Sequence, residues 1–162
     1  MTNLFLGKQF DLAQARLLEQ QVMYDPADLT THGLIVGMTG SGKTGLGISL
    51  LEEAALNHIP ALVIDPKGDL TNLLLHFPNL APADFQPWID PEAARRQGKP
   101  LETLAAETAA SWRAGLAGWG IGPERILALQ QSAQFAVYTP GSDAGLPVSI
   151  LASLKAPNIP WE

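Results

Sequence analysis

The stretch Gly33–Thr44 reads GLIVGMTGSGKT and contains the most informative pattern in the chain. Its second part, Gly37–Thr44, matches G-x-x-x-x-G-K-[ST] at every fixed position, which is the pattern of a phosphate-binding P-loop. The apolar run Gly33–Gly37 before it is typical of a buried parallel strand. The segment Lys43–Asn57 after it has apolar residues at helical spacing. Because strand, glycine-rich turn and helix are the context that the pattern requires, we predict a phosphate-binding loop here.

Each residue type in the loop has a physical reason. Glycines adopt backbone conformations closed to residues with a Cβ, so consecutive N–H groups can point at phosphate oxygens, and a helix that starts at the loop adds its positive dipole end. Lys43 supplies a charge for the β- and γ-phosphates, and the Thr44 hydroxyl is suited to bind Mg²⁺. We therefore predict a nucleoside triphosphate site for ATP with Mg²⁺, formed by Gly37, Met38, Thr39, Gly40, Ser41, Gly42, Lys43, Thr44 and Gly45.

Asp65 is the second candidate. The run Ala61–Ile64 (ALVI) predicts another buried strand that ends at Asp65, and with Gly33–Gly37 and the helix it would form a βαβ unit with a right-handed crossover. Its carboxylate would then lie at the carboxyl edge of the sheet, where such folds bind ligands. Two interpretations stay open: Asp65 is a metal ligand or catalytic residue near the γ-phosphate, or it only caps the turn Asp65–Asp69 (DPKGD). Pro66 occupies the place of a water-polarising Glu.

A GTPase is disfavoured. Asp65–Gly68 matches the D-x-x-G switch motif, but only 21 residues separate Lys43 from Asp65, which leaves no room for a switch I segment, and no N-K-x-D motif is present. Asp69 is predicted to be the N-cap of a helix over Leu70–Phe77.

Outside the motifs, His32 is interpreted as structural. Trp112 and Trp119 lie seven residues apart and are expected to pack in the core rather than form a partner-binding stripe.

The predicted fold class is α/β, and two regions are expected. Residues 1–30 should form a strand pair, around Leu4–Phe10 and Gln21–Tyr24, with a lead-in that includes a helical turn at Pro26–Leu29. Residues 31–162 should form the P-loop domain. Within it, residues 78–134 are expected to be a helical insertion between the second and third strands, because about 70 residues exceed an ordinary crossover.

Finer boundaries follow for that domain. An irregular proline-rich loop is expected over 78–91, and helices over Leu101–Leu116 and Pro123–Gln134. Further strands are expected at Phe135–Thr139 and Pro147–Leu151.

Composition excludes several classes of protein. The 162 residues carry a net charge of −6 and are 46% hydrophobic, which argues for a globular domain and against a surface built to neutralise nucleic acid. The absence of cysteine rules out disulfides, thiolate metal sites and cysteine nucleophiles. No signal peptide or membrane-spanning run is evident, so a cytoplasmic location is expected.

Three segments together resemble a known family: Thr31–Thr44 (THGLIVGMTGSGKT), Asp65–Asp69 (DPKGD) and Tyr138–Gly141 (YTPG) are similar to the HerA/FtsK superfamily of ATPases. This group contains DNA-translocating helicases, DNA pumps, and conjugation and secretion ATPases. The resemblance implies a RecA-like (ASCE) P-loop core with a parallel sheet. It also implies ATP hydrolysis coupled to the movement of DNA or protein, and assembly into a ring, a hexamer by resemblance.

The sequence also departs from that family. Such enzymes carry a later strand that ends in Asp-Glu, a polar sensor residue and an arginine finger, and none of these follows Tyr138–Gly141. We therefore expect the N-terminal part of a longer ATPase, which alone binds ATP, hydrolyses it slowly and binds duplex DNA weakly. The alternatives are a non-hydrolysing nucleotide-binding module and a small P-loop phosphotransferase. The latter needs an arginine-rich lid, whereas Arg95-Arg96 is the only adjacent arginine pair.

Overall fold

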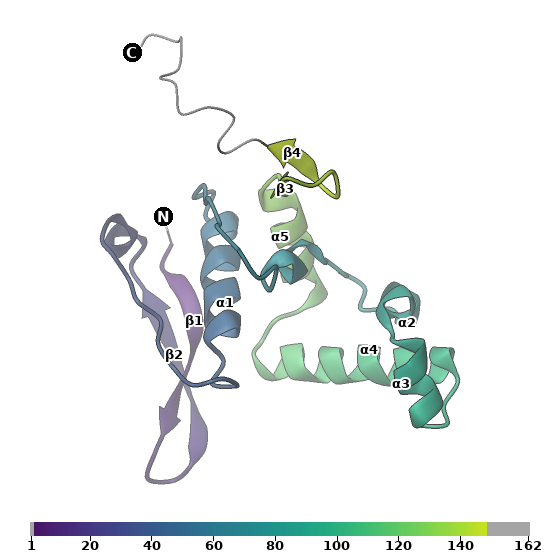
Figure 1. The fold of residues 1–162 in the computed structure, drawn as a ribbon. Helices are drawn as coiled ribbons and strands as arrows, with labels where there is room; N and C mark the ends of the chain where they lie inside the picture. Colours follow the sequence, from purple (N-terminus) through teal and green to yellow (C-terminus); the bar gives the residue numbers. More distant parts are fainter. Residues whose placement is uncertain (1, 149–162) are drawn as a thin grey trace.

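The computed structural model describes residues 2–148 (Figure 1). The chain opens with an antiparallel hairpin of β1 (Leu4–Asp11) and β2 (Arg16–Tyr24). At its turn, Asp11 Oδ1 accepts hydrogen bonds from the N–H groups of Ala13 (2.9 Å) and Gln14 (3.1 Å), so the carboxylate closes the loop between the strands. The predicted N-terminal strand pair is confirmed. So is the helical turn after it, which is the 3₁₀ helix η1 (Pro26–Thr30).

The P-loop helix packs against this hairpin. Helix α1 (Lys43–Leu56) lies beside β1, and Figure 1 shows the two running side by side. Leu4 is completely buried, and Ala54 and Ala55 in the last turns of α1 are buried as well. The predicted helix is confirmed, and its small residues allow the close approach of strand and helix.

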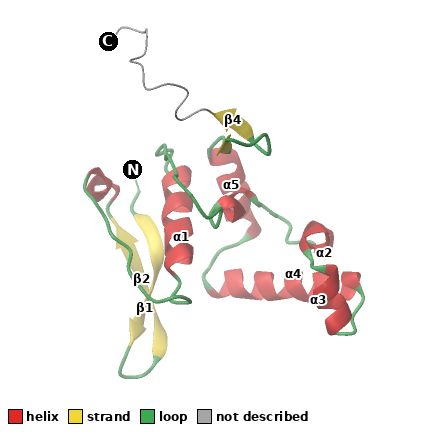
Figure 2. Ribbon diagram, viewed as in Figure 1, coloured by secondary structure: helices red, strands yellow, loops and turns green. Residues whose placement is uncertain are grey.

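The interval from Pro78 to Gln134 is helical, as predicted (Figure 2). Leu80, Phe85 and Ala109 form its buried centre. Residues 78–91 are not the irregular loop that was predicted, because they form two short helices with a proline at the first or second position, which suits a helix start. The segments are α2 (Pro82–Phe85), the 3₁₀ helix η3 (Gln86–Trp88), α3 (Pro91–Arg96), α4 (Leu101–Gly118) and α5 (Pro123–Ser132).

The two strands predicted beside the P-loop helix are wrong. Residues 33–37 and 61–64 have no regular secondary structure and are unpaired, and the side chains of Leu34 and Leu62 are 85% and 91% exposed. A buried strand needs hydrogen-bonded neighbours, and nothing within residues 2–148 pairs with either segment. The predicted βαβ unit is therefore absent from this part of the chain.

The third predicted strand is shorter in the structure and pairs with a later one. β3 (Tyr138–Pro140) pairs in parallel with β4 (Leu146–Val148), with Tyr138 opposite Leu146. Residues 149–151 of the predicted fourth strand lie outside the described residues. The fold is thus α/β, but among residues 2–148 the strands form two separate two-stranded sheets rather than one continuous parallel sheet.

Two local predictions are also corrected. The helix predicted over Leu70–Phe77 is only the 3₁₀ helix η2 (Thr71–Leu74), and its N-cap residue is Leu70 rather than Asp69. Trp112 and Trp119 are not core residues, because they stay 56% and 40% exposed, although the Trp112 ring lies 6.5 Å from that of Phe85. No helix within the described residues is long and apolar enough to span a bilayer.

Candidate functional site: the P-loop and the Asp65 turn

The P-loop backbone has the shape that its glycines permit. Gly40 and Gly42 have φ angles of +81° and +88°, a region that residues with a Cβ rarely adopt. The loop is tightened by the N–H of Ser41, which donates to the carbonyl of Met38 at 3.1 Å. A Cβ on Gly37 would lie 2.4 Å from Ser41 Oγ, so this position is closed to a larger residue unless Ser41 moves.

The loop leads directly into the N-terminus of α1. The helix begins at Lys43, with Gly42 as the N-cap residue, and no side chain caps it. The N–H groups of the first turn have no partner within the helix, so this end carries a partial positive charge and free donors. Thr44 and Gly45 belong to that turn and are exposed. An anion beside the loop would therefore satisfy donors that the protein itself leaves open.

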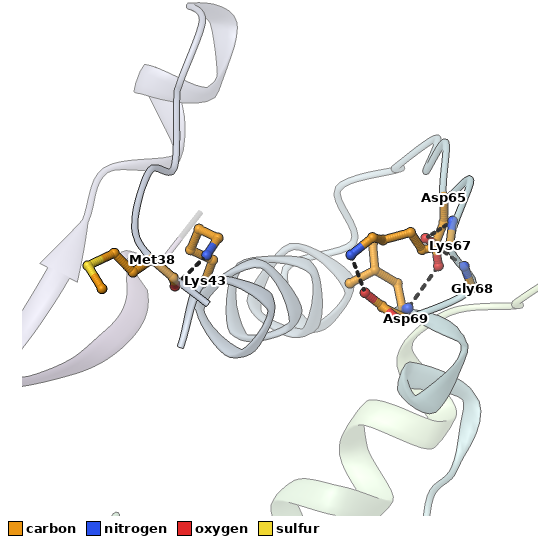
Figure 3. Close-up of polar contacts among 7 residues, drawn as sticks. Met38, Lys43, Asp65, Lys67, Gly68 and Asp69 are labelled. Atoms are coloured by element: carbon orange, nitrogen blue, oxygen red, sulfur yellow. Dashed lines mark hydrogen bonds and ion pairs between the residues drawn. The ribbon is translucent and has the colours of Figure 1, made fainter. Parts of the chain in front are cut away.

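Lys43 lies over the loop. Its ammonium donates a hydrogen bond to the carbonyl oxygen of Met38 at 2.7 Å, as Figure 3 shows. The side chain therefore folds back toward the loop instead of extending into solvent. Positive-φ glycines, an uncapped helix terminus and a lysine over the loop together fit a phosphate group at this place.

Asp65 caps the turn that follows residues 61–64. Its Oδ1 accepts from the N–H groups of Lys67 (3.2 Å) and Gly68 (2.9 Å), and its Oδ2 accepts from the N–H of Leu70 (2.8 Å). These bonds, that of Leu70 first, hold the pKa of the Asp65 carboxyl below its ordinary value against the opposing effect of desolvation. Of the two interpretations of Asp65, its capping role is thus present in the structure, and a role at the metal stays a prediction.

Lys67 and Asp69 complete the turn. Lys67 Nζ lies 3.7 Å from Asp69 Oδ2, and both side chains are well exposed. Asp69 therefore forms an ion pair within the turn. The side-chain bond expected from it at a helix start is not made, because η2 begins at Thr71 with Leu70 as its N-cap residue and no side-chain cap.

The structure does not bring the two candidate regions into contact. Figure 3 shows Lys43 with Met38 in one cluster and the Asp65 turn in another, and no hydrogen bond or ion pair joins Asp65 to Lys43 or Thr44. Over residues 2–148, no three acidic or histidine side chains are grouped closely enough to hold a metal ion. Thr44 and Asp65 therefore do not form a complete metal site by themselves.

A buried ion pair was missed from the sequence. Glu53 on α1 is only 6% exposed; one of its oxygens accepts from Arg125 of α5, and the other accepts from the N–H of Phe5 at 2.8 Å. A signal was present, because Leu46, Leu50 and Glu53 share helical spacing and place a carboxylate within the apolar stripe. The pair ties β1 and α5 to the P-loop helix.

Comparison with known protein families finds a match over more than half of the chain. The family described as "Helicase HerA, central domain" matches residues 16–114, which are 99 of the 162 residues. The chain belongs to this family. The matched part of the HerA domain contains the P-loop, α1 and the Asp65 turn, and it ends within α4. No curated protein and no solved structure matches the chain. This match confirms the predicted resemblance at the level of the family. HerA-type proteins are in general ATPases that use ATP with Mg²⁺.

Proposed function

We propose that this chain is the ATP-binding part of a HerA-type motor, which couples ATP hydrolysis to the translocation of DNA or protein through an oligomeric ring. The observation that carries the proposal is the P-loop itself: positive-φ glycines lead into an uncapped helix, with Lys43 held over the loop. The family assignment supports ATP rather than another phosphate compound. A RecA-like core, completed by strands beside residues 33–37 and 61–64, belongs to the same proposal.

Residues 37–45 would hold the triphosphate. The N–H groups of the first turn of α1 would donate to phosphate oxygens, and Lys43 would exchange its bond to the Met38 carbonyl for a bond to a phosphate. That exchange is favourable because a hydrogen bond between two charged groups is stronger than one to a neutral carbonyl. The Lys43 ammonium is thus held near the loop by the Met38 carbonyl, in the place where it would bind a phosphate.

Thr44 and Asp65 are the proposed residues for Mg²⁺. The hydroxyl of Thr44 lies in the exposed first turn of α1, next to Lys43. Asp65 is the second candidate, since its bonds to backbone N–H groups keep it ionised and hard carboxylate oxygens suit this cation. Mg²⁺, when bound, supplies charge neutralisation and orientation of the β- and γ-phosphates.

The first test removes the lysine. We expect Mg-ATP to bind the wild-type chain and to bind Lys43→Ala at least about tenfold more weakly, because the phosphate charge loses its cation. Isothermal titration calorimetry measures both affinities, and circular dichroism confirms that the variant folds. Arg95→Ala is the matched control: it removes one exposed positive charge at the end of α3 and should leave the affinity unchanged. Equal affinities of wild type and Lys43→Ala would overturn the assignment.

The second test concerns magnesium. Thr44→Ala should bind ATP with a smaller enhancement by Mg²⁺ than wild type, because the variant lacks the hydroxyl ligand. Thr44→Ser keeps a hydroxyl at the same place and should retain the enhancement. Titrating Mg²⁺ at fixed ATP compares the three proteins. If Thr44→Ala followed the wild-type curve, Thr44 would not be a ligand, and Asp65→Asn would be the next variant to measure.

A further inference from the structure

A hollow between the helices lies away from the P-loop. It has a volume of about 410 Å³ and is bordered by α1, α4, α5 and the segment from η2 to η3. This volume falls within the range of small-molecule pockets, which are typically lined by apolar and aromatic side chains with a few polar groups. The hollow is therefore a candidate site for a ligand other than the nucleotide.

Much of the lining is aromatic. Phe77, Phe85, Trp88 and Trp112 form what we call the aromatic wall. The ring centroids of Phe77 and Phe85 lie 5.0 Å apart in an edge-on arrangement, and those of Phe85 and Trp112 lie 6.5 Å apart. Such a wall suits an aromatic ligand, because rings pack edge to face or offset. It also tolerates a positive charge, since the faces of aromatic rings attract cations.

The charged part of the lining comes from other helices. Glu52 of α1 and Arg125 of α5 line the hollow, and Figure 1 shows α1 beside α5, with α2 away from both over α4. Arg125 donates a hydrogen bond to Glu53, which is buried, so its charge is already matched by a carboxylate. Two carboxylates and one guanidinium leave one negative charge at this end of the hollow, and that charge is on Glu52.

Glu52 has no partner of its own. Within residues 2–148 its carboxylate is in no hydrogen bond and no ion pair, and Arg125 bonds to Glu53 instead. The side chain is half-buried, and the enclosed unpaired atom of this part of the chain is His76 Nε2 rather than a Glu52 oxygen, so a ligand can reach the carboxylate. Burial raises the pKa of the Glu52 carboxyl, and the charge of Arg125 only partly offsets this. A bound cation would supply the missing partner.

The arrangement suits an organic cation better than a metal ion. Divalent cations take several oxygen ligands, and no three acidic or histidine side chains are grouped for this purpose in residues 2–148. A single ammonium group needs only one carboxylate beside it, and Glu52 provides that.

The hollow is separate from the nucleotide site. Glu52 and Leu56 on its wall lie nine and thirteen residues beyond Lys43 along α1. At about 1.5 Å per helical residue, this places the wall roughly 14–20 Å from the P-loop lysine. A ligand here would therefore contact the same helix as the nucleotide without sharing its binding groups.

We propose that this hollow binds a small aromatic amine with one positive charge. Its ammonium group pairs with the Glu52 carboxylate, and its ring packs against the aromatic wall. Both halves of the ligand are specified by the lining: the ring by Phe and Trp side chains, and the charge by the unpaired carboxylate.

The experiment compares three probes that share one biphenyl body: biphenyl-4-ylmethanamine, the neutral biphenyl-4-ylmethanol and the anionic biphenyl-4-carboxylate. Indole N–H signals in ¹H–¹⁵N NMR spectra of the full chain report on binding. We expect saturable shifts at Trp88 and Trp112, which line the hollow, and not at Trp119, which does not line it. The amine should bind about tenfold more tightly than the alcohol, because a charge-assisted hydrogen bond is stronger than a neutral one. The carboxylate should bind most weakly, and Mg-ATP should not displace the amine.

The variant Glu52→Gln keeps the size of the side chain but removes its charge, so the preference for the amine over the alcohol should fall to about twofold or less. Glu102→Gln removes the same charge from an exposed position of α4 outside the hollow and should retain the preference.

The proposal is overturned if the amine gives no saturable shifts, or if the alcohol or the carboxylate binds wild type as tightly. It is also overturned if the preference survives in Glu52→Gln, if it is lost in Glu102→Gln, or if Mg-ATP competes. The order of the three probes on wild type decides the matter even where Glu52→Gln does not fold.

Discussion

At the scale of single residues, Asp65 shows how one carboxylate organises a turn. Three backbone N–H groups converge on its two oxygens, and such bonds favour the ionised form. Because its folded-state pKa is lowered, Asp65 contributes stability that is present above the unfolded pKa of about 3.9. That contribution is lost as the pH falls through the folded-state pKa.

A comparison of Asp65→Asn with wild type tests whether the ionised Asp65 carboxylate stabilises the fold. The amide can accept through one oxygen only, so the variant should melt at a lower temperature at neutral pH. The difference should shrink as the pH falls below about 4, where wild type also loses the charge. Thermal unfolding in EDTA over this pH range provides the measurement. Asp28→Asn, an exposed aspartate of η1, is the charge-matched control and should show no such trend. A pH-independent difference for Asp65→Asn would contradict the capping account.

Residues whose partners are close in sequence could be predicted, and the P-loop is the best example. Its glycines, Lys43 and the helix start are all local, and the structure has them as expected. Asp69 could not be placed correctly, because capping propensity alone does not show at which residue a helix begins. The helix η2 begins one residue later than predicted, with Leu70 as its N-cap residue, and Asp69 pairs with Lys67 instead.

At the scale of elements, the apolar runs at 33–37 and 61–64 were predicted to be strands because Leu, Ile and Val in such runs are usually buried. The pattern reports a preference for burial, whereas the strand itself requires neighbours that are distant in sequence. In residues 2–148 those neighbours are absent, so the segments stay unpaired and exposed. The hairpin β1–β2 was predictable because its partner strand follows after one short turn.

The difference between exposed apolar segments and buried strands can be tested by comparing the same substitution in each. Leu62→Ala should change the free energy of unfolding by no more than about 0.5 kcal/mol, because Leu62 is almost fully exposed. Leu4→Ala makes the same chemical change at a completely buried position and should cost about 2–5 kcal/mol. Urea denaturation of both variants measures the two values. A loss of 2 kcal/mol or more in Leu62→Ala would mean that residues 61–64 are packed in solution.

At the scale of the whole molecule, the described chain buries little apolar material. Its buried apolar residues are Leu4, Ala54, Ala55, Leu80, Phe85, Ala94, Ala105, Ala109 and Leu129, most of which are alanines. Larger side chains such as Leu34, Val36 and Ile64 remain exposed on the unpaired segments. Exposed apolar segments with unpaired backbone groups can pair with a neighbouring chain, which is consistent with a subunit of a larger assembly.

The balance of acidic and basic residues in the whole chain predicts that this chain alone binds duplex DNA weakly. Affinity for a duplex comes mainly from Lys and Arg that neutralise phosphates. Here ten basic residues face sixteen acidic ones. Half of the basic residues are already in ion pairs with carboxylates, namely Lys8, Lys67, Arg96, Lys99 and Arg125. Lys43 is assigned to the nucleotide, so few cations are left to form a continuous basic surface.

Fluorescence anisotropy with a labelled duplex, at low and at physiological salt, measures this directly. We expect a dissociation constant at or above about 100 µM at physiological salt, the weak end of non-specific binding, with little further loss as salt rises because few counterions are released. A ring would grip DNA through several subunits at once, so each contact can be weak while the assembly binds firmly. Dissociation constants in the micromolar range or below that persist at physiological salt would contradict this account. They would require a basic surface formed by association of copies, which sedimentation at the same concentrations would detect.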